Sequence, residues 1–262
     1  MKSTNPTSKP LKDSQSISKV FLQPLFGELY TWNQKYLDNI SQVKGWEWKI
    51  FTPHKLWGSK NTEIIEMDLK GFDQLVKKAT GIDPKNYLDG PAPHKNLTDY
   101  YPAYGHIFSS YIKDYDYWGH TNWDCVYGRL SHFLPDSELI KAKIWADESN
   151  EVNGTFSMYR NKLEINTLYQ DVKGWQKSFT EHKLFGCDET TFSKHVVKHG
   201  YVTTPKNYPF LSYDRFPQHI PKPRLEYKDR RLYELFEDTV TGRTIGKEIF
   251  FFHFSYTKKW PL

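Results

Sequence analysis

Residues Tyr115–Phe133 read YDYWGHTNWDCVYGRLSHF, and this stretch decides the fold. Its first half, Tyr115–His120, is rich in aromatic residues and predicts a buried strand. A polar corner follows at residues 121–124, and apolar residues then recur at helical spacing. We therefore expect a strand that runs into a polar corner and then into a helix.

The polar corner carries oxygen-bearing side chains two residues apart. Alternation along an extended segment aims Asn122 and Asp124 the same way, with Trp123 on the opposite side. Hard divalent cations prefer such oxygen ligands and keep open positions for a phosphate. The alternative is that any Asn-x-Asp at a strand end is a turn cap, and two polar residues taken alone favour that interpretation.

The rest of the chain has the pattern of a mainly parallel sheet with crossover helices. Apolar runs and amphipathic spacing predict, in order, a strand at 20–27, a helix at 29–43, strands at 46–52 and 63–69, and a helix at 72–81. Two strands joined through a turn at 241–243 are expected near the C-terminus. Ligands bind at the carboxyl ends of strands in such sheets, where Gln23, Thr52 and Asn122 would lie.

Composition limits the class of protein. The 262 residues suit one large α/β domain or two small ones. Aromatic residues make up 17% of the chain, and they can line sugar sites as well as fill a core. A net charge of +5 without a basic run argues against nucleic-acid binding and suits an anionic ligand such as a nucleotide diphosphate.

The chain also carries signals about its compartment. No apolar run approaches the ~20 residues that span a bilayer. Residues 1–18 predict a disordered leader and lack the apolar stretch of a signal peptide. The two cysteines, Cys125 and Cys187, predict free thiols in a reducing compartment. We therefore expect a soluble, intracellular, cytoplasmic protein without a transmembrane segment.

Several motifs resemble those of GT-A glycosyltransferases. The corner at 122–124 is similar to their D-x-D motif, with Asn122 in place of the first Asp. PLFG at 24–27, FT at 51–52 and KNLTDYYPAYG at 95–105 resemble, in the same order, motifs of an uncharacterised GT-A-like family found among polysaccharide-building genes. His253 and Lys259 keep the spacing of a C-terminal metal- and pyrophosphate-binding element of some GT-A enzymes, although Tyr256 stands where glycine is usual.

The resemblance implies a GT-A-like (Rossmann-like), mixed and mainly parallel sheet flanked by helices, as a single domain over residues 19–262. It implies a glycosyltransferase that moves sugar from a nucleotide-sugar donor, a UDP-sugar, to a hydroxyl of a glycan acceptor. Mn²⁺ or Mg²⁺ would be held by Asp124 and His253, with Asn122 direct or through water. The donor-binding residues that it implies are Gln23, Pro24, Phe26, Thr52, Lys95, Asp99, Tyr104, Asn122, Trp123 and Lys259.

Two adjacent acids, Asp188 and Glu189, precede a predicted helix that ends at Gly200. One interpretation is structural, because Asp188 is a natural N-cap and acids in a first turn favour the helix dipole. The other is catalytic: the two acids would orient or deprotonate the acceptor hydroxyl.

Two other classes of function remain open at this point. One is a catalytically silent nucleotide- or carbohydrate-binding protein on the same fold. Asn122 favours it, because a neutral amide binds a divalent cation less strongly than a carboxylate does. The other is a hydrolase, whose paired carboxylates would have to flank a glycosidic bond.

Overall fold

The computed structural model describes residues 16–84, 93–146, 151–152, 154–181, 184–204, 211–212 and 224–254. Residues 1–15 of the predicted leader lie outside this part of the chain, and so does Lys259. Lys95 lies in a described helix, but its side chain is not described.

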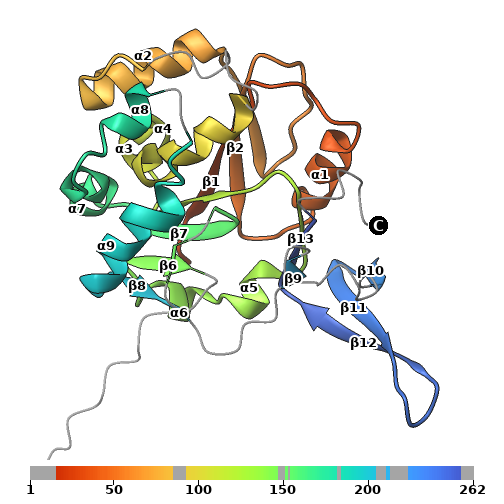
Figure 1. The fold of residues 1–262 in the computed structure, drawn as a ribbon. Helices are drawn as coiled ribbons and strands as arrows, with labels where there is room; N and C mark the ends of the chain where they lie inside the picture. Colours follow the sequence, from red (N-terminus) through yellow and green to blue (C-terminus); the bar gives the residue numbers. More distant parts are fainter. Residues whose placement is uncertain are drawn as a thin grey trace, which may run out of the picture.

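A seven-stranded mixed sheet forms the centre of the molecule, in the order β3-β2-β1-β4-β7-β6-β8 (Figure 1). In this sheet β7 is antiparallel to both of its neighbours, and the other pairings are parallel. The strands are β1 (Lys19–Pro24), β2 (Glu47–Thr52), β3 (Thr62–Glu66), β4 (Tyr117–Thr121), β6 (Ile144–Ala146), β7 (Phe156–Arg160) and β8 (Val202–Thr203). The predicted mixed and mainly parallel sheet flanked by helices is confirmed.

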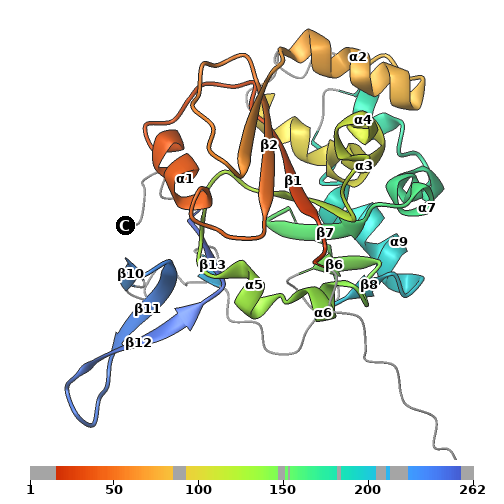
Figure 2. The same cartoon turned by 180° about the vertical axis from the view of Figure 1, so that it is seen from behind.

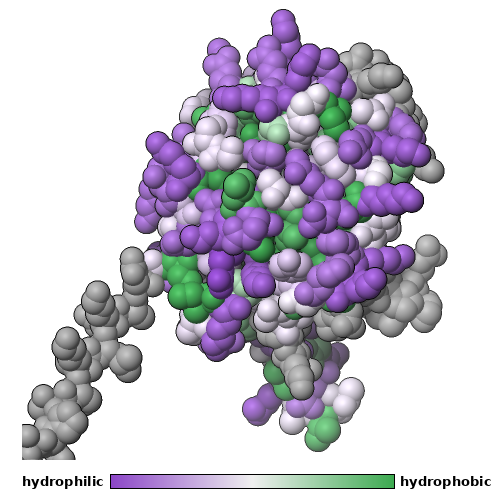
Figure 3. All heavy atoms as spheres, turned by 90° about the vertical axis from the view of Figure 1, so that its left-hand side faces the viewer, coloured by the Kyte–Doolittle hydropathy of each residue, from purple (hydrophilic) through white to green (hydrophobic). Residues whose placement is uncertain are grey.

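Many helices pack against one face of this sheet (Figures 1 and 2). They are α2 (Leu69–Thr80), η1 (Pro93–Ala103), α3 (Tyr104–Ile107), α4 (Ser109–Ile112), α7 (Leu163–Asn166), η2 (Leu168–Asp171), α8 (Lys177–Thr180), η3 (Asp188–Phe192) and α9 (Ser193–Lys198). In Figure 3, which looks onto this helical side, hydrophilic side chains separate smaller hydrophobic patches.

The opposite face carries fewer helices and a second, small sheet. The helices are α1 (Asn33–Ile40), α5 (Leu130–Phe133) and α6 (Asp136–Leu139). The small sheet has the order β5-β13-β9, from β5 (Cys125–Tyr127), β13 (Phe251–His253) and β9 (Leu211–Ser212). A third sheet of β10 (Arg224–Lys228), β11 (Arg231–Glu237) and β12 (Thr244–Ile249) projects from the body (Figure 1).

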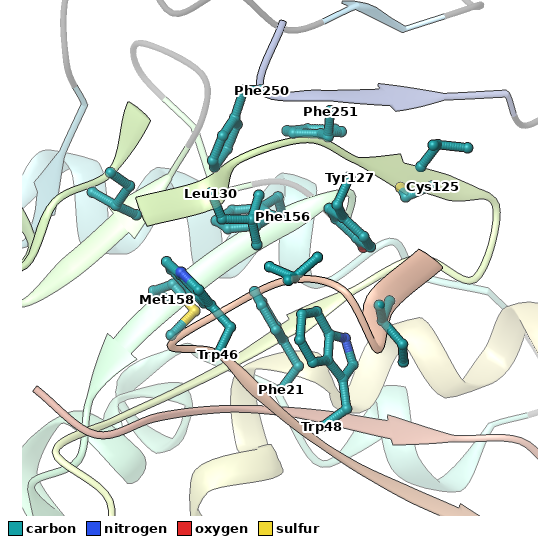
Figure 4. Packing of buried hydrophobic residues seen from close by; sticks show 14 of the residues in the cluster. Phe21, Trp46, Trp48, Cys125, Tyr127, Leu130, Phe156, Met158, Phe250 and Phe251 are labelled. Carbon is teal, nitrogen blue, oxygen red and sulfur yellow. The ribbon is translucent and has the colours of Figure 1, made fainter. Parts of the chain in front are cut away.

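Two hydrophobic cores lie on the two faces of the main sheet, and strand alternation assigns residues to them. In β1, Val20 and Leu22 join the core under the many helices, whereas Phe21 points into the other core. That second core is strongly aromatic (Figure 4), and the Phe21 ring packs against Trp46 and Phe156 with centroids 5.5 and 5.1 Å apart. The high aromatic content is therefore used largely in packing.

Most predicted elements are confirmed, with clear local causes. Asp68 caps α2 by accepting a hydrogen bond from the Gly71 amide at 2.8 Å, and Gly81 ends the helix in the left-handed region at φ 75°. The prediction that a helix begins directly after the polar corner is wrong. Residues 125–127 form β5 there, because β13 supplies an antiparallel partner from the far end of the chain.

Within the described residues, no helix has the length and apolar character needed to cross a bilayer. Both cysteines, Cys125 and Cys187, are buried free thiols, as expected.

Close packing between β4 and β7 gives a stability prediction. A Cβ on Gly119 would lie 2.3 Å from the Met158 sulfur and 2.5 Å from the Ser157 carbonyl oxygen. Because the second atom belongs to the paired backbone, Gly119→Ala should destabilise the protein by about 2 kcal/mol or more. Thermal unfolding should show a clearly lower Tm. Gly246→Ala, at a strand position that meets only movable side chains of Leu235 and Tyr233, is the control. An unchanged Tm for the Gly119 variant would contradict this strand pairing.

Candidate active site

The site is built at the carboxyl ends of β1 and β4. The buried Gln23 side chain donates to the Thr121 carbonyl at 3.1 Å, which ties the two strand ends together. After Thr121 the chain turns through the polar corner. Trp123 packs on the ring of Tyr36 at 4.9 Å, and its indole N–H donates to the Pro24 carbonyl at 3.4 Å. The Trp123 side chain is thus anchored in the protein, while Asn122 and Asp124 approach a common neighbour.

That common neighbour is His253, which β13 delivers from the C-terminal part of the chain. Antiparallel pairing sets His253 opposite Cys125, and the Phe254 amide donates to the Asp124 carbonyl at 2.9 Å. His253 Nε2 then lies 3.2 Å from Asp124 Oδ1 and 3.3 Å from Asn122 Nδ2. Backbone pairing therefore brings together the three residues predicted to be metal ligands.

The spacing of these atoms suits a divalent cation. Two neighbouring ligands of an octahedral ion, with bonds of about 2.1–2.3 Å, lie about 3 Å apart. Asp124 keeps 25% of its side chain exposed, so its carboxylate can be reached from solvent. The described residues contain no cluster of three or more His, Cys, Asp or Glu side chains suited to a metal. A cation here would therefore have to take further ligands from a bound molecule or from water.

The acids at 188 and 189 lie on the other side of the same region. Asp188 is only 2% exposed, whereas Glu189 is exposed and its Oε1 accepts from the Gly154 amide at 3.2 Å. Burial, and then the charges of Glu189 and Asp99, raise the pKa of Asp188 well above 3.8. The structure thus places a buried carboxyl of raised pKa beneath an exposed carboxylate.

The turn that carries these acids is unusually wide. The Phe192 amide donates to the Cys187 carbonyl five residues earlier at 2.9 Å, so η3 is a π-helical turn. Such turns are frequent at functional sites. The prediction that Asp188 is the N-cap is wrong, because the N-cap is Cys187 and Asp188 is already inside the turn.

Tyr101, which was not among the predicted site residues, lies between the corner and the acids, because the Tyr101 ring and the Asp188 carboxyl both border Gly154. Its hydroxyl donates to Asn122 Oδ1 at 3.2 Å, and its ring stacks on His120 with centroids 4.2 Å apart. Burial lowers the pKa of His120 to about 3, so this imidazole is neutral. Tyr101 lies inside the quoted stretch at 95–105, but no periodicity or spacing in that stretch points to the corner.

The remaining predicted donor-binding residues divide into two groups. Pro24 and Thr52 end β1 and β2, as expected, and Phe26 follows in the adjoining loop with its ring 5.5 Å from that of Phe72. The second group is engaged by the protein itself. Asp99 is buried and accepts from the Phe185 and Cys187 amides, which fixes the loop before η3.

Tyr104 and Gln23 belong to the same internally bonded group. The Tyr104 hydroxyl donates to the Leu97 carbonyl at 3.3 Å. Gln23, besides its bond to β4, accepts from the Tyr36 hydroxyl at 2.6 Å. Both side chains are buried, and these contacts are made within the protein itself.

Fold and site together define the class, a mixed α/β protein with an acid–histidine pair at its strand ends. The particular family follows from the sequence: the chain belongs to a family of unknown function (DUF6625), whose model matches residues 21–259. No curated protein matches the chain.

Among solved structures, the chain is similar to the galactosyltransferase LgtC in complex with donor and acceptor sugar analogs. The identity is 10%, the match covers 75% of this chain and 76% of that chain, and the TM-score is 0.43. A structure of an active-site mutant of LgtC matches at 10% identity over 90% and 86% of the two chains, also with a TM-score of 0.43. Likeness at this level carries no information about activity.

Proposed function

We propose that the protein is a metal-dependent glycosyltransferase that moves a sugar from a nucleotide diphosphate donor, a UDP-sugar, to a hydroxyl of a glycan acceptor. The observation that carries the proposal is the approach of Asp124 Oδ1 to His253 Nε2, 3.2 Å apart at the strand ends. Mixed nitrogen–oxygen ligation suits Mn²⁺ better than Mg²⁺. A diphosphate would supply further oxygen ligands.

The proposed metal has a simple chemical purpose. When bound, it would neutralise charge that develops on the diphosphate as the sugar leaves, which is the main electrostatic demand of this reaction. Asp124 and His253 would hold it at the carboxyl ends of β1 and β4, against the diphosphate. Lys259, outside the described residues, is expected to contact the pyrophosphate as well.

The two acids serve the acceptor side in this proposal. Glu189 is the exposed member of the pair, so an acceptor hydroxyl can reach it, and the Gly154 amide orients its carboxylate. It would accept the hydroxyl proton if the reaction inverts the sugar, and would orient the acceptor if the reaction retains it. Asp188 places a second carboxyl beneath it, which would help to position donor and acceptor.

UDP should raise the Tm of the protein, and the increase should be larger with Mn²⁺ than with EDTA. A ligand that binds the native state alone stabilises it by mass action, about 2.7 kcal/mol at a concentration 100 times Kd. Thermal unfolding at several UDP concentrations measures this effect. Uridine, which lacks the diphosphate, is the control for the contribution of the diphosphate. The absence of any shift at millimolar UDP and Mn²⁺ would refute the proposed donor.

A measurement of turnover distinguishes the proposed enzyme from the alternative function, a catalytically silent binding protein, which Asn122 favours. We expect slow hydrolysis of one member of a UDP-sugar panel in the presence of Mn²⁺ and without acceptor. Release of UDP, followed by chromatography, is the readout. UDP binding without metal-dependent hydrolysis or transfer of any panel member would support the silent binding protein instead.

A further inference from the structure

Asp99, in η1, holds the loop that leads into the two acids at 188 and 189. Its Oδ2 accepts from the Phe185 amide at 2.9 Å, and its Oδ1 accepts from the Cys187 amide at 2.8 Å. The residue is only 1% exposed. Both carboxyl oxygens are therefore engaged by the protein interior, and the side chain is not available to a bound donor.

The backbone of this loop is shaped to receive a carboxyl group. Gly186 lies at φ 57°, in the left-handed region that favours glycine, and Cys187 follows in the right-handed region at φ −58° and ψ −38°. Such alternation turns successive amide N–H groups to one side, where they form an anion-binding nest. Burial raises the pKa of Asp99, and hydrogen bonds from the amides of residues 185–187 oppose that rise. The Asp99 carboxyl thus occupies a nest that the loop provides.

The same loop sets the place of the two acids. Asp188 and Glu189 follow the nest directly, inside the π-helical turn η3. On its far side, Glu189 Oε1 accepts from the Gly154 amide at 3.2 Å. Asp99 also lies close enough for its charge, after burial and the charge of Glu189, to raise the pKa of Asp188. Asp99 is therefore connected to the exposed Glu189 carboxylate through the loop, without facing solvent itself.

We infer that Asp99 is a positioning residue for the acceptor-side acid Glu189. By holding residues 185–187 it fixes the start of η3, and so the place from which Glu189 would meet an acceptor hydroxyl. The inference rests on the proposed glycosyltransferase function and deepens it. It gives Asp99 a different role from the donor contact that the resemblance implied, and the two roles predict different effects on donor affinity.

Asp99→Asn tests the inference, because an amide keeps one accepting oxygen and its NH2 group cannot accept the second backbone hydrogen. Mn²⁺-dependent hydrolysis of the UDP-sugar, with water in place of the acceptor, should fall about 100-fold, the cost of a displacement of about 1 Å at a reacting group. The Kd of UDP with Mn²⁺ should stay within about 2-fold. Unchanged hydrolysis, or a loss confined to UDP affinity, would overturn the inference.

Asp68→Asn is the matched control. Asp68 also accepts from a backbone amide, that of Gly71 at 2.8 Å, but it does so at the start of α2. Asparagine caps helices as well as aspartate does. This variant loses the same charge, so it should leave hydrolysis and UDP affinity unchanged.

A Glu189→Gln background distinguishes positioning from general damage. With the acid already absent, adding Asp99→Asn should lower hydrolysis by about 10-fold at most, because residues that act through one another are not additive. A loss of about 100-fold in both backgrounds would show a merely structural role and reject the inference.

Hydrogen exchange of the Gly154 amide gives a readout that needs no substrate. This amide donates to Glu189, so it should exchange about 10-fold faster in Asp99→Asn than in wild type, as a locally opened hydrogen bond does. NMR of protein with nitrogen-labelled glycine measures the rate. Glu189→Ala gives the rate expected when the accepting carboxylate is missing.

Gly186→Val disturbs the nest from the loop side and serves if Asp99→Asn does not fold. A β-branched residue is strained at φ 57°, so the Gly154 amide should again exchange faster. A wild-type exchange rate in either folded variant would reject the link from Asp99 to Glu189. If no UDP-sugar were turned over, the proposed function would fail, and the exchange rates would still decide whether Asp99 positions Glu189.

Discussion

Asp124→Ala and His253→Ala should each abolish the enhancement of UDP binding by Mn²⁺. Asp124 Oδ1 and His253 Nε2 lie 3.2 Å apart and would bind the same cation. Because the protein would supply only these two ligands, the loss of either one should release the cation. We expect turnover to fall by at least about 100-fold in each variant, the upper range seen even when only a supporting group is lost. Calorimetric titration of UDP with Mn²⁺ and with EDTA measures the enhancement directly.

The double variant sharpens this test. Residues that act as a unit do not add, so the combined loss should be little greater than either single loss. Asp114→Ala and His132→Ala, at exposed positions, control for loss of an acid or an imidazole. Circular dichroism should show intact folds in all variants. Additive losses, or a full Mn²⁺ effect in either single variant, would disprove a shared cation site.

Asp188→Asn should make the protein more stable at neutral pH and less active. Burial and the charges of Glu189 and Asp99 raise the Asp188 pKa above its unfolded value of 3.8. A group with a raised folded pKa contributes stability below the unfolded pKa, and that stability is lost as pH rises through the folded pKa. As the pH rises above 3.8, the wild-type protein therefore loses stability that the protein with a neutral amide keeps.

The expected size is a Tm increase of about 2–4 °C at neutral pH, corresponding to about 1 kcal/mol. Near pH 3 the carboxyl is protonated in the folded and in the unfolded state, so wild type and Asp188→Asn should have the same Tm. Turnover should fall by about 100-fold, the order typical of a lost acid–base or electrostatic group, with UDP affinity nearly unchanged. Glu189→Gln should lose turnover without gaining stability. A Tm for Asp188→Asn at neutral pH that is equal to or below the wild-type value would contradict the predicted gain in stability.

Local patterns in the sequence were enough for much of the fold. The amphipathic spacing and Gly81 defined α2, and the apolar runs at 20–27 and 46–52 became β1 and β2. The polar corner at 122–124 followed from its place at the end of an aromatic strand, although residues 123–124 form a turn and not the extended segment that was expected. In each case the cause lies within a few residues of the effect, so single-sequence reasoning can detect it.

The parts that could not be predicted depend on contacts between distant segments. β5 forms because β13 pairs with it, and no pattern within residues 125–127 indicates which segment that partner will be. Tyr101 reaches Asn122 through the packing of η1 over β4, and the wide turn at Asp188 depends on the loop that Asp99 holds. Burial also decided the state of His120 and Asp188, and burial is a property of the whole fold.

The position of His253 in the chain has a consequence for biosynthesis. All seven strands of the main sheet come from residues 19–203, whereas β13 spans only Phe251–His253. Chains leave the ribosome from the N-terminus, and early segments fold first. The sheet can thus assemble on a nascent chain whose acid–histidine pair is still incomplete. Under the proposed function, a sugar nucleotide would meet a complete acid–histidine pair only after β13 has paired with β5.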